Sequence, residues 1–155
     1  FNQALNIDNT DILSHYYRGW ASYYMGLNND ALVDAEYCVK NRGNNAYSLK
    51  GWAQYKLGNY EEAFSDFNEC IRLNKTDSKC YNGKGNYYYN KKNFQLALDA
   101  FSKAIKYNSQ EGKYYFNRGL ANARLRYKGA ACSDYREAIR LGFIQAQSNL
   151  NADCK

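Results

Sequence analysis

Small and apolar residues recur along this chain at positions three, four and seven apart, with polar residues between them. The segment 60–73 shows the pattern clearly, because Ala63, Phe67 and Cys70 fall on one face of a helix. Short stretches rich in glycine, asparagine and lysine separate such segments near 26–29, 58–59, 92–93 and 128–129. The pattern predicts pairs of α-helices joined by tight turns.

The helical pairs repeat along the chain with a spacing of 32, 34 and 34 residues. Three sets of equivalent positions share this spacing: Gly19, Gly51, Gly85 and Gly119; Ala31, Ala63, Ala97 and Ala131; and Ala35, Phe67, Phe101 and Tyr135. A fixed period of this length indicates one helix-turn-helix unit copied along the chain. Glycine inside a helix costs about 1 kcal/mol, so we expect the two helix backbones of a unit to approach closely at the glycine.

Two runs of residues resemble the tetratricopeptide repeat family: YSLKGWAQYKLGNYEEAFSDFNECIRLN at 47–74 and YYFNRGLANARLRYKGAACSDYREAIRLG at 114–142. The resemblance implies an all-α fold, a right-handed α-solenoid of helix-turn-helix repeats in a single domain, 1–155. Four full repeats are predicted at 12–43, 44–77, 78–111 and 112–143. Residues 1–11 match the second helix of a preceding repeat, so we expect further protein before Phe1. Gln54 and Asn122 depart from the family, which usually has apolar residues there.

The repeat pattern ends near Gly142, but an apolar stripe continues beyond it. Phe143, Ala146, Leu150 and Cys154 share one helical face. We predict a C-terminal capping helix over 144–155, because a terminal repeat without a cap would expose its apolar face to water.

The net charge of +6 conceals an asymmetry along the chain. Residues 1–70 carry 5 Lys or Arg against 9 Asp or Glu, and residues 71–155 carry 16 against 6, so the two parts have net charges of −4 and +10. A basic half of this kind can attract an acidic partner. No stretch approaches the roughly 18 apolar residues of a membrane-spanning helix.

Five cysteines leave at least one without a partner inside the chain. Cys132 and Cys154 stand level about a turn near residue 143, which favours a disulfide between them. Cys70 and Cys80 stand level about Lys75, and both pairings require an oxidising compartment. The closing segment also resembles repeat proteins of bacterial envelopes. That resemblance favours a bacterial periplasm or cell envelope, with the cytoplasm as the alternative.

Candidate catalytic chemistry is sparse. His15 is the only histidine and has no zinc-ligand companion, since the spacing of the cysteines is wrong for a metal site. The acidic residues at 61–69 and 134–137 lie along amphipathic helices, and Glu61 and Glu62 belong to a first turn, where negative charge complements the helix dipole. The sequence therefore predicts no catalytic residue, no metal and no cofactor.

The resemblance implies that the first helices of the repeats line a groove that holds a protein or peptide. The predicted groove residues are Tyr16, Trp20, Tyr23, Trp52, Tyr55, Lys79, Asn82, Asn86, Tyr89, Lys113, Phe116, Asn117 and Arg124. Rings can anchor a peptide while amides bond to its backbone, although the same stripe at helical spacing is also compatible with a core. The cations Lys79, Lys113 and Arg124 favour a partner with an acidic segment.

Family members that bind the acidic tails of heat-shock chaperones use a Lys, Asn, Asn, Lys, Arg set. The corresponding residues are Tyr16, Trp20, Leu49, Lys79 and Gly83 in one alignment, and Ser48, Trp52, Gly83, Lys113 and Asn117 in the other. One match in five each time argues against that carboxylate clamp. Two alternatives to a protein-binding scaffold remain: single-stranded nucleic-acid binding by the basic half, and an accessory domain of an enzyme whose catalytic part lies upstream.

Overall fold

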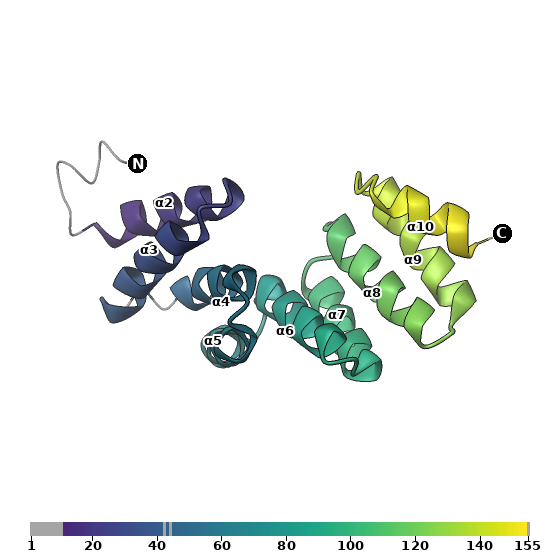
Figure 1. Cartoon of the computed structure of the whole chain (residues 1–155), viewed down its shortest axis with the longest axis horizontal. Helices are drawn as coiled ribbons and strands as arrows, with labels where there is room; N and C mark the ends of the chain where they lie inside the picture. Colours follow the sequence, from purple (N-terminus) through teal and green to yellow (C-terminus); the bar gives the residue numbers. More distant parts are fainter. Residues whose placement is uncertain (1–10, 42, 44, 155) are drawn as a thin grey trace. The chain divides into compact units, whose positions relative to one another are not determined.

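The computed structural model describes residues 11–41, 43 and 45–154, and these residues form paired helices (Figure 1). The chain divides into two compact units, Phe1–Lys75 and Thr76–Lys155, which are described separately below. The helix predicted for residues 1–11 lies outside the described residues, apart from Asp11. Among the described residues, no helix is long and apolar enough to cross a membrane.

Unit 1 holds two helical pairs. They are α2 (Ile12–Tyr24) with α3 (Asn28–Lys40), and α4 (Ala46–Leu57) with α5 (Tyr60–Leu73). Each helix packs on the next one in the chain, and the first helices of the two pairs, α2 and α4, also touch each other. Asp11 caps the N-terminus of α2, because its carboxylate accepts a hydrogen bond from the backbone N–H of Leu13 at 3.0 Å.

Unit 2 holds two further pairs and a closing helix. They are α6 (Ser78–Asn90) with α7 (Phe94–Tyr107), α8 (Gly112–Arg124) with α9 (Lys128–Arg140), and α10 (Ala146–Asp153). Helix α6 contacts α8, and α10 packs against α9. The prediction of an all-α repeat fold closed by a C-terminal helix is confirmed for the described residues.

The same turn joins the two helices of every pair. After α2, the N–H of Gly26 bonds to the carbonyl of Tyr23 and the N–H of Leu27 bonds to that of Ser22, which is a Schellman ending. Its central residue has a positive φ, +82° at Gly26 and +88° at Gly58. The equivalent residues of unit 2 are Lys92 and Arg126, with φ of +60° and +63°.

The helical glycines make room for a ring on the partner helix. A Cβ added to Gly119 would lie 2.6 Å from Cε1 of Tyr135, and one added to Gly51 would lie 2.7 Å from Cε1 of Phe67. Gly85 has the same relation to Phe101. The nearest neighbour of these glycines is thus an aromatic side chain rather than a helix backbone, which corrects the reason expected from the sequence.

The first repeat fills this position differently. Ala35 stands where the other repeats have a ring, and it leaves a gap beside Gly19. Leu49 of the following repeat occupies that gap, because its Cδ2 lies 2.6 Å from the Cβ that Gly19 lacks. Ala31, Ala35 and Leu49 are fully buried in one apolar cluster.

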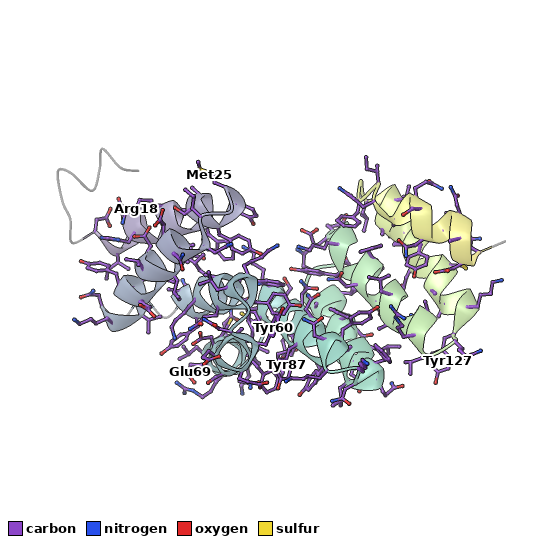
Figure 2. All side chains as sticks on the ribbon, in the orientation of Figure 1. Arg18, Met25, Tyr60, Glu69, Tyr87 and Tyr127 are labelled. Carbon is purple, nitrogen blue, oxygen red and sulfur yellow. A yellow bond between two sulfur atoms is a disulfide. The ribbon has the colours of Figure 1, made fainter. Side chains whose placement is uncertain are left out.

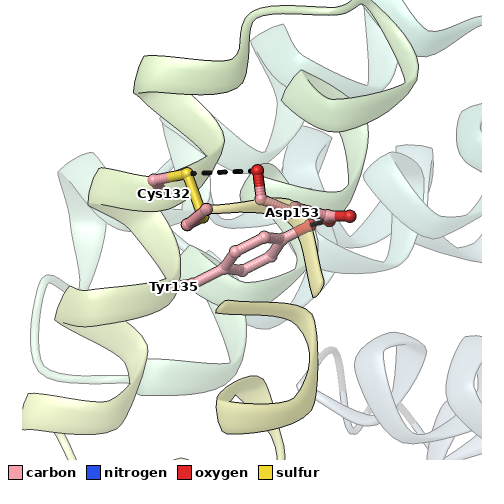
Figure 3. The surroundings of a disulfide bond; sticks show 4 residues. Cys132, Tyr135 and Asp153 are labelled. Carbon is pink, nitrogen blue, oxygen red and sulfur yellow. Dashed lines mark hydrogen bonds between the residues drawn. A yellow bond between two sulfur atoms is a disulfide. The ribbon is translucent and has the colours of Figure 1, made fainter. Parts of the chain in front are cut away.

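The capping helix is held to α9 by apolar contacts and by a disulfide, whose surroundings are shown in Figure 3. Ala146, Leu150 and Phe143 pack on the cluster that contains Tyr135. Cys132 of α9 is joined to Cys154, just beyond α10. The Tyr135 hydroxyl donates a hydrogen bond of 3.4 Å to the carboxylate of Asp153. The other pairing expected from the sequence, Cys70 with Cys80, involves one cysteine of each unit and stays a prediction.

The packing at the glycines leads to a stability prediction. Gly119→Ala should lower the free energy of unfolding by about 1 to 3 kcal/mol, because the new methyl group overlaps the Tyr135 ring. The matched control is Gly129→Ala in α9, where an added Cβ meets nothing within 4 Å; it should be neutral or slightly stabilising. Urea unfolding monitored by circular dichroism would measure both, and equal effects would contradict the assignment.

A second prediction concerns the disulfide. It closes a loop with a sequence separation of 22, so Cys154→Ser should destabilise the fold by about 3 kcal/mol. Helix α10 has only 8 residues and would be marginal without the link. We therefore expect its amide hydrogens to exchange faster in the variant, measured by mass spectrometry, while those of α6 keep their protection.

Candidate functional site

Aromatic rings form a continuous series across the first helices of unit 1. Trp20 lies 5.6 Å from Tyr23, and Tyr23 lies 6.5 Å from Trp52 of α4, measured between ring centroids. The series continues from Trp52 to Tyr55 at 5.7 Å and begins with Tyr16, 6.4 Å from Trp20. The structure thus brings together all five unit 1 residues that the sequence predicted for the groove.

These rings differ in exposure. Tyr16, Trp20, Tyr23 and Tyr55 are half-buried, whereas Trp52 is only 7% exposed and packs on the Phe67 ring at 5.3 Å. The sequence left open whether this stripe belongs to a groove or to the core. Trp52 belongs to the packing of unit 1, because its indole lies between helices α4 and α5.

Sequence reasoning missed two rings that complete this surface. Tyr17 and Tyr24 are 50% and 75% exposed, and Tyr24 stacks on Trp20 at 5.8 Å. Met25, labelled in Figure 2, follows at the end of α2 and is also 75% exposed. The signal was present in the sequence, since Leu13, Tyr17 and Tyr24 recur on one helical face. Together, Tyr16, Tyr17, Trp20, Tyr23, Tyr24 and Tyr55 form what we call the aromatic surface.

In unit 2 the predicted amides bond to one another. The Nδ2 atom of Asn117 donates to Oδ1 of Asn82 at 2.9 Å, and Nδ2 of Asn86 donates to the Asn82 carbonyl at 2.9 Å. Asn82 and Asn117 are 2% and 8% exposed. Their hydrogen-bonding groups therefore join α6 to α8, and these two amides are not displayed on a surface.

The other predicted residues of unit 2 are divided between surface and core. Arg124 is exposed and donates through Nε to the Tyr89 hydroxyl at 3.1 Å, while Lys79 and Lys113 are exposed near the starts of α6 and α8. Phe116 turns the other way, because its ring lies 5.0 Å from that of Phe143 in the cluster beneath the cap. Only the cations, Asn86 and Tyr89 could meet a partner here.

Buried ion pairs between the two helices of a repeat were not predicted. Arg18 bonds to Asp34, Lys50 to Asp66 at 3.0 Å, and Arg118 to Asp134 at 2.7 Å. The sequence signal is periodic, since each cation stands directly before a glycine of the repeat. Asp66 and Asp134 are 6% and 4% exposed. Both carboxylates point at the preceding helix.

The two polar departures from the family pattern are explained by local bonds. Asn122 donates to the buried carboxylate of Asp134 at 2.9 Å, and Gln54 accepts from the side chain of Asn59 at 3.0 Å. Asn122 bonds to Asp134, but Gln54, which stands at the equivalent position of an earlier repeat, bonds to Asn59 and not to Asp66. Its Oδ2 is buried without a partner, and this burial raises the pKa of Asp66 despite the opposing effect of Lys50.

His15 and the carboxylates of the cleft beside α8 and α9 are bonded to neighbouring side chains. His15 is 6% exposed, stacks on Tyr37 at 3.9 Å and bonds through Nδ1 to Asp34 at 2.7 Å. A cleft of about 370 Å³ beside α8 and α9 contains carboxylates. Each of those carboxylates, Asp134 and Glu137, is paired with an arginine.

Two family models described as "Tetratricopeptide repeat" match the chain, one over residues 45–77 and 78–111 and the other over residues 112–141. The chain belongs to the tetratricopeptide repeat family. The matched segments correspond to three of the helical pairs seen in the structure, α4 with α5, α6 with α7, and α8 with α9. No curated protein sequence matches the chain significantly.

Solved structures support the same fold. TTC0263, a thermophilic tetratricopeptide repeat protein of Thermus thermophilus, superposes with a TM-score of 0.84 at 16% identity, over 98% of this chain and 86% of that one. MamA from Desulfovibrio magneticus RS-1 gives 0.70 at 22% identity, over 91% and 81%. The first repeat domain of Spaghetti (RPAP3), bound to the HSP90 peptide SRMEEVD, gives 0.65 at 23%, over 68% and 86%. At these identities the likeness shows the fold alone.

Tetratricopeptide repeats are generally scaffolds that bind proteins or peptides and carry no catalytic groups. The family and the fold support such a role for this chain.

The burial of Tyr23 predicts how stability changes at alkaline pH. Burial, followed by the nearby Tyr24 and Tyr55, raises the pKa of Tyr23 from 10.0 to about 12. Between these values the unfolded chain loses the proton that the folded chain keeps, so the free energy of unfolding should fall as pH rises above 10. Tyr23→Phe should make this fall shallower. Urea unfolding at several pH values would measure it, and an unchanged slope would contradict the assignment.

Proposed function

We propose that the chain is a non-catalytic interaction module that holds an extended segment of another protein on the first helices of its repeats. The observation that carries the proposal is the aromatic surface of unit 1. Its rings are held by one another and by the apolar cluster around Leu49, against which Trp20 and Tyr23 pack. Half-buried rings of this kind lose little conformational freedom when they contact a ligand.

The exposed part of the aromatic surface has the chemistry of a peptide anchor. Tyr17 and Tyr24 present large apolar faces together with hydroxyl groups that can bond to a peptide backbone. Trp20 supports Tyr24 from below by stacking. Aromatic residues in such positions supply much of the binding energy of many interfaces.

The first helices of unit 2 offer a more polar surface to the same kind of partner. Lys79, Lys113 and Arg124 are exposed on α6 and α8, so an acidic segment is favoured there. The chaperone-tail clamp remains disfavoured, because each alignment has one matching residue in five. In the second alignment, Asn117 stands at the arginine position and is bonded to Asn82. Nucleic-acid binding is less favoured at the aromatic surface, since Asp30, Glu61 and Glu62 occupy the first turns of the helices that pack beside it.

A peptide-display selection against the whole chain would test the proposal. Tyr24→Ala should weaken binding of the selected peptides by about 1 to 2 kcal/mol without changing the thermal midpoint, because Tyr24 is 75% exposed. Trp52→Ala should instead lower stability by about 3 kcal/mol, as expected for a buried ring. Binding would be measured by fluorescence anisotropy and stability by circular dichroism.

The matched control is Val33→Ala, which shortens an apolar side chain that is 63% exposed on α3, a second helix of the same unit. It should leave peptide binding unchanged. If Tyr24→Ala and Val33→Ala have the same effect, or if no peptide is selected, then the aromatic surface is not the docking site.

A further inference from the structure

Five basic side chains gather at one edge of unit 2, where its two helical pairs make their turns. We call this the turn edge, and its members are Lys91, Lys92, Arg124, Arg126 and Lys128. Four of them end or follow the first helices α6 and α8, and Lys128 begins α9. The segments 90–98 and 123–133 contain no acidic residue, so the charge that both turns carry is entirely positive.

The two turns lie next to each other. The Nε atom of Arg124, at the end of α8, donates to the hydroxyl of Tyr89, near the end of α6, at 3.1 Å. Lys91 lies over the ring of Tyr87 at 5.6 Å, and Tyr127, labelled in Figure 2, marks the other turn. All five cations are exposed. The contact between Arg124 and Tyr89 therefore brings the basic ends of α6 and α8 together on neighbouring repeats.

Two of the cations stand where the backbone favours glycine. Lys92 and Arg126 have φ of +60° and +63°, and the equivalent residues of unit 1 are Gly26 and Gly58. A residue with a Cβ is disfavoured in this left-handed region. Glycine would fit both turns without that cost, as unit 1 shows. Placing basic side chains there suggests a role other than stability, since strained backbone is concentrated at functional positions.

The helices that start at this edge are also unlike those of unit 1. Helix α3 has Asp30 in its first turn and α5 has Glu61 and Glu62, whereas α7 and α9 have no acidic residue there. Carboxylates in a first turn offset the positive end of the helix dipole. The first turns of the second helices therefore carry carboxylates in unit 1, whereas those of unit 2 carry none and follow a loop with basic residues.

We propose that the turn edge of unit 2 is a second docking surface, which binds an acidic segment of a partner protein rich in Glu and Asp. The surface is separate from the aromatic surface of unit 1 and does not depend on it. It shares Arg124 with the basic first helices of unit 2, so the inference rests on and deepens that part of the proposed function. Guanidinium and ammonium groups on two adjacent turns can bond to carboxylates on successive residues of an extended peptide. The charges also speed the encounter with such a segment.

An acidic peptide fits this edge better than a nucleic acid does. Single-stranded nucleic acids bind through a series of rings on which successive bases stack, interleaved with cations. Of the described rings at the turn edge, Tyr127 alone is more than half exposed. Tyr89 is used by Arg124, and Tyr87 lies beneath Lys91. Among the described residues, this edge therefore exposes five cations but one ring on which a base could stack.

The test uses the whole chain and the double variant Lys92→Gly/Arg126→Gly. The probe is a fluorescent peptide of about eight glutamates, which spans roughly 26 Å when extended. We expect its affinity to fall about tenfold at low ionic strength, since two charge-assisted contacts are lost. The thermal midpoint should stay the same or rise, because glycine relieves both left-handed positions. A loss of binding without a loss of stability would support the proposal.

A matched control removes the same charge elsewhere in unit 2. Lys103→Ala/Lys106→Ala eliminates two exposed cations from α7 and should weaken binding of the glutamate peptide by less than twofold. Equal losses in both double variants would show that only net charge matters and would overturn the proposal. Tighter binding of an oligouridylate of the same length, lost in the glycine variant, would assign the edge to nucleic acid instead. Neither result involves Tyr24, so the proposed function is tested independently.

Discussion

The rest of the structure depends on the contact between a helical glycine and a ring on the partner helix. Gly51 faces Phe67, Gly85 faces Phe101 and Gly119 faces Tyr135. Each glycine costs helix propensity, but the ring that fills its place buries a large apolar area. Because the ring is rigid, it fixes the depth at which the two helices pack. The alanines at 31, 63, 97 and 131, all buried, allow the helices to remain close along their length.

This packing decides which side chains are paired inside a repeat and which are exposed. Once the glycine side of a first helix is turned inward, the cation directly before Gly19, Gly51 or Gly119 reaches a buried aspartate on the second helix, as in Arg18 with Asp34. Carboxylates and guanidinium groups that are paired in this way have structural roles, because separating them would leave a buried charge. Outside these pairs, unit 1 exposes Tyr17 and Tyr24, and unit 2 exposes the five cations of the turn edge. The two proposed docking surfaces rest on that difference.

The turns of the two units share a backbone conformation but differ in the residues that adopt it and in their charge. Unit 1 has glycine in the left-handed position and carboxylates in the following helical turn, as in Gly58 with Glu61 and Glu62. Unit 2 has Lys92 and Arg126 in that position and no carboxylate in the first turn of the helix that follows. The backbone is nearly the same in both, so the difference lies in charge. Local electrostatics can therefore vary between repeats while the fold stays constant.

The sequence by itself determined the repeats, the positions of the helices and turns, and the closing helix, because each depends on spacing within a short segment. The period of the glycines and the stripe from Phe143 to Cys154 were sufficient. Tertiary structure decided which side of each stripe meets water. It buried Trp52 against Phe67, joined Asn82 to Asn117, and exposed Tyr24 at the end of α2. A helical period places residues on a face, but only the neighbouring helices decide whether that face is covered.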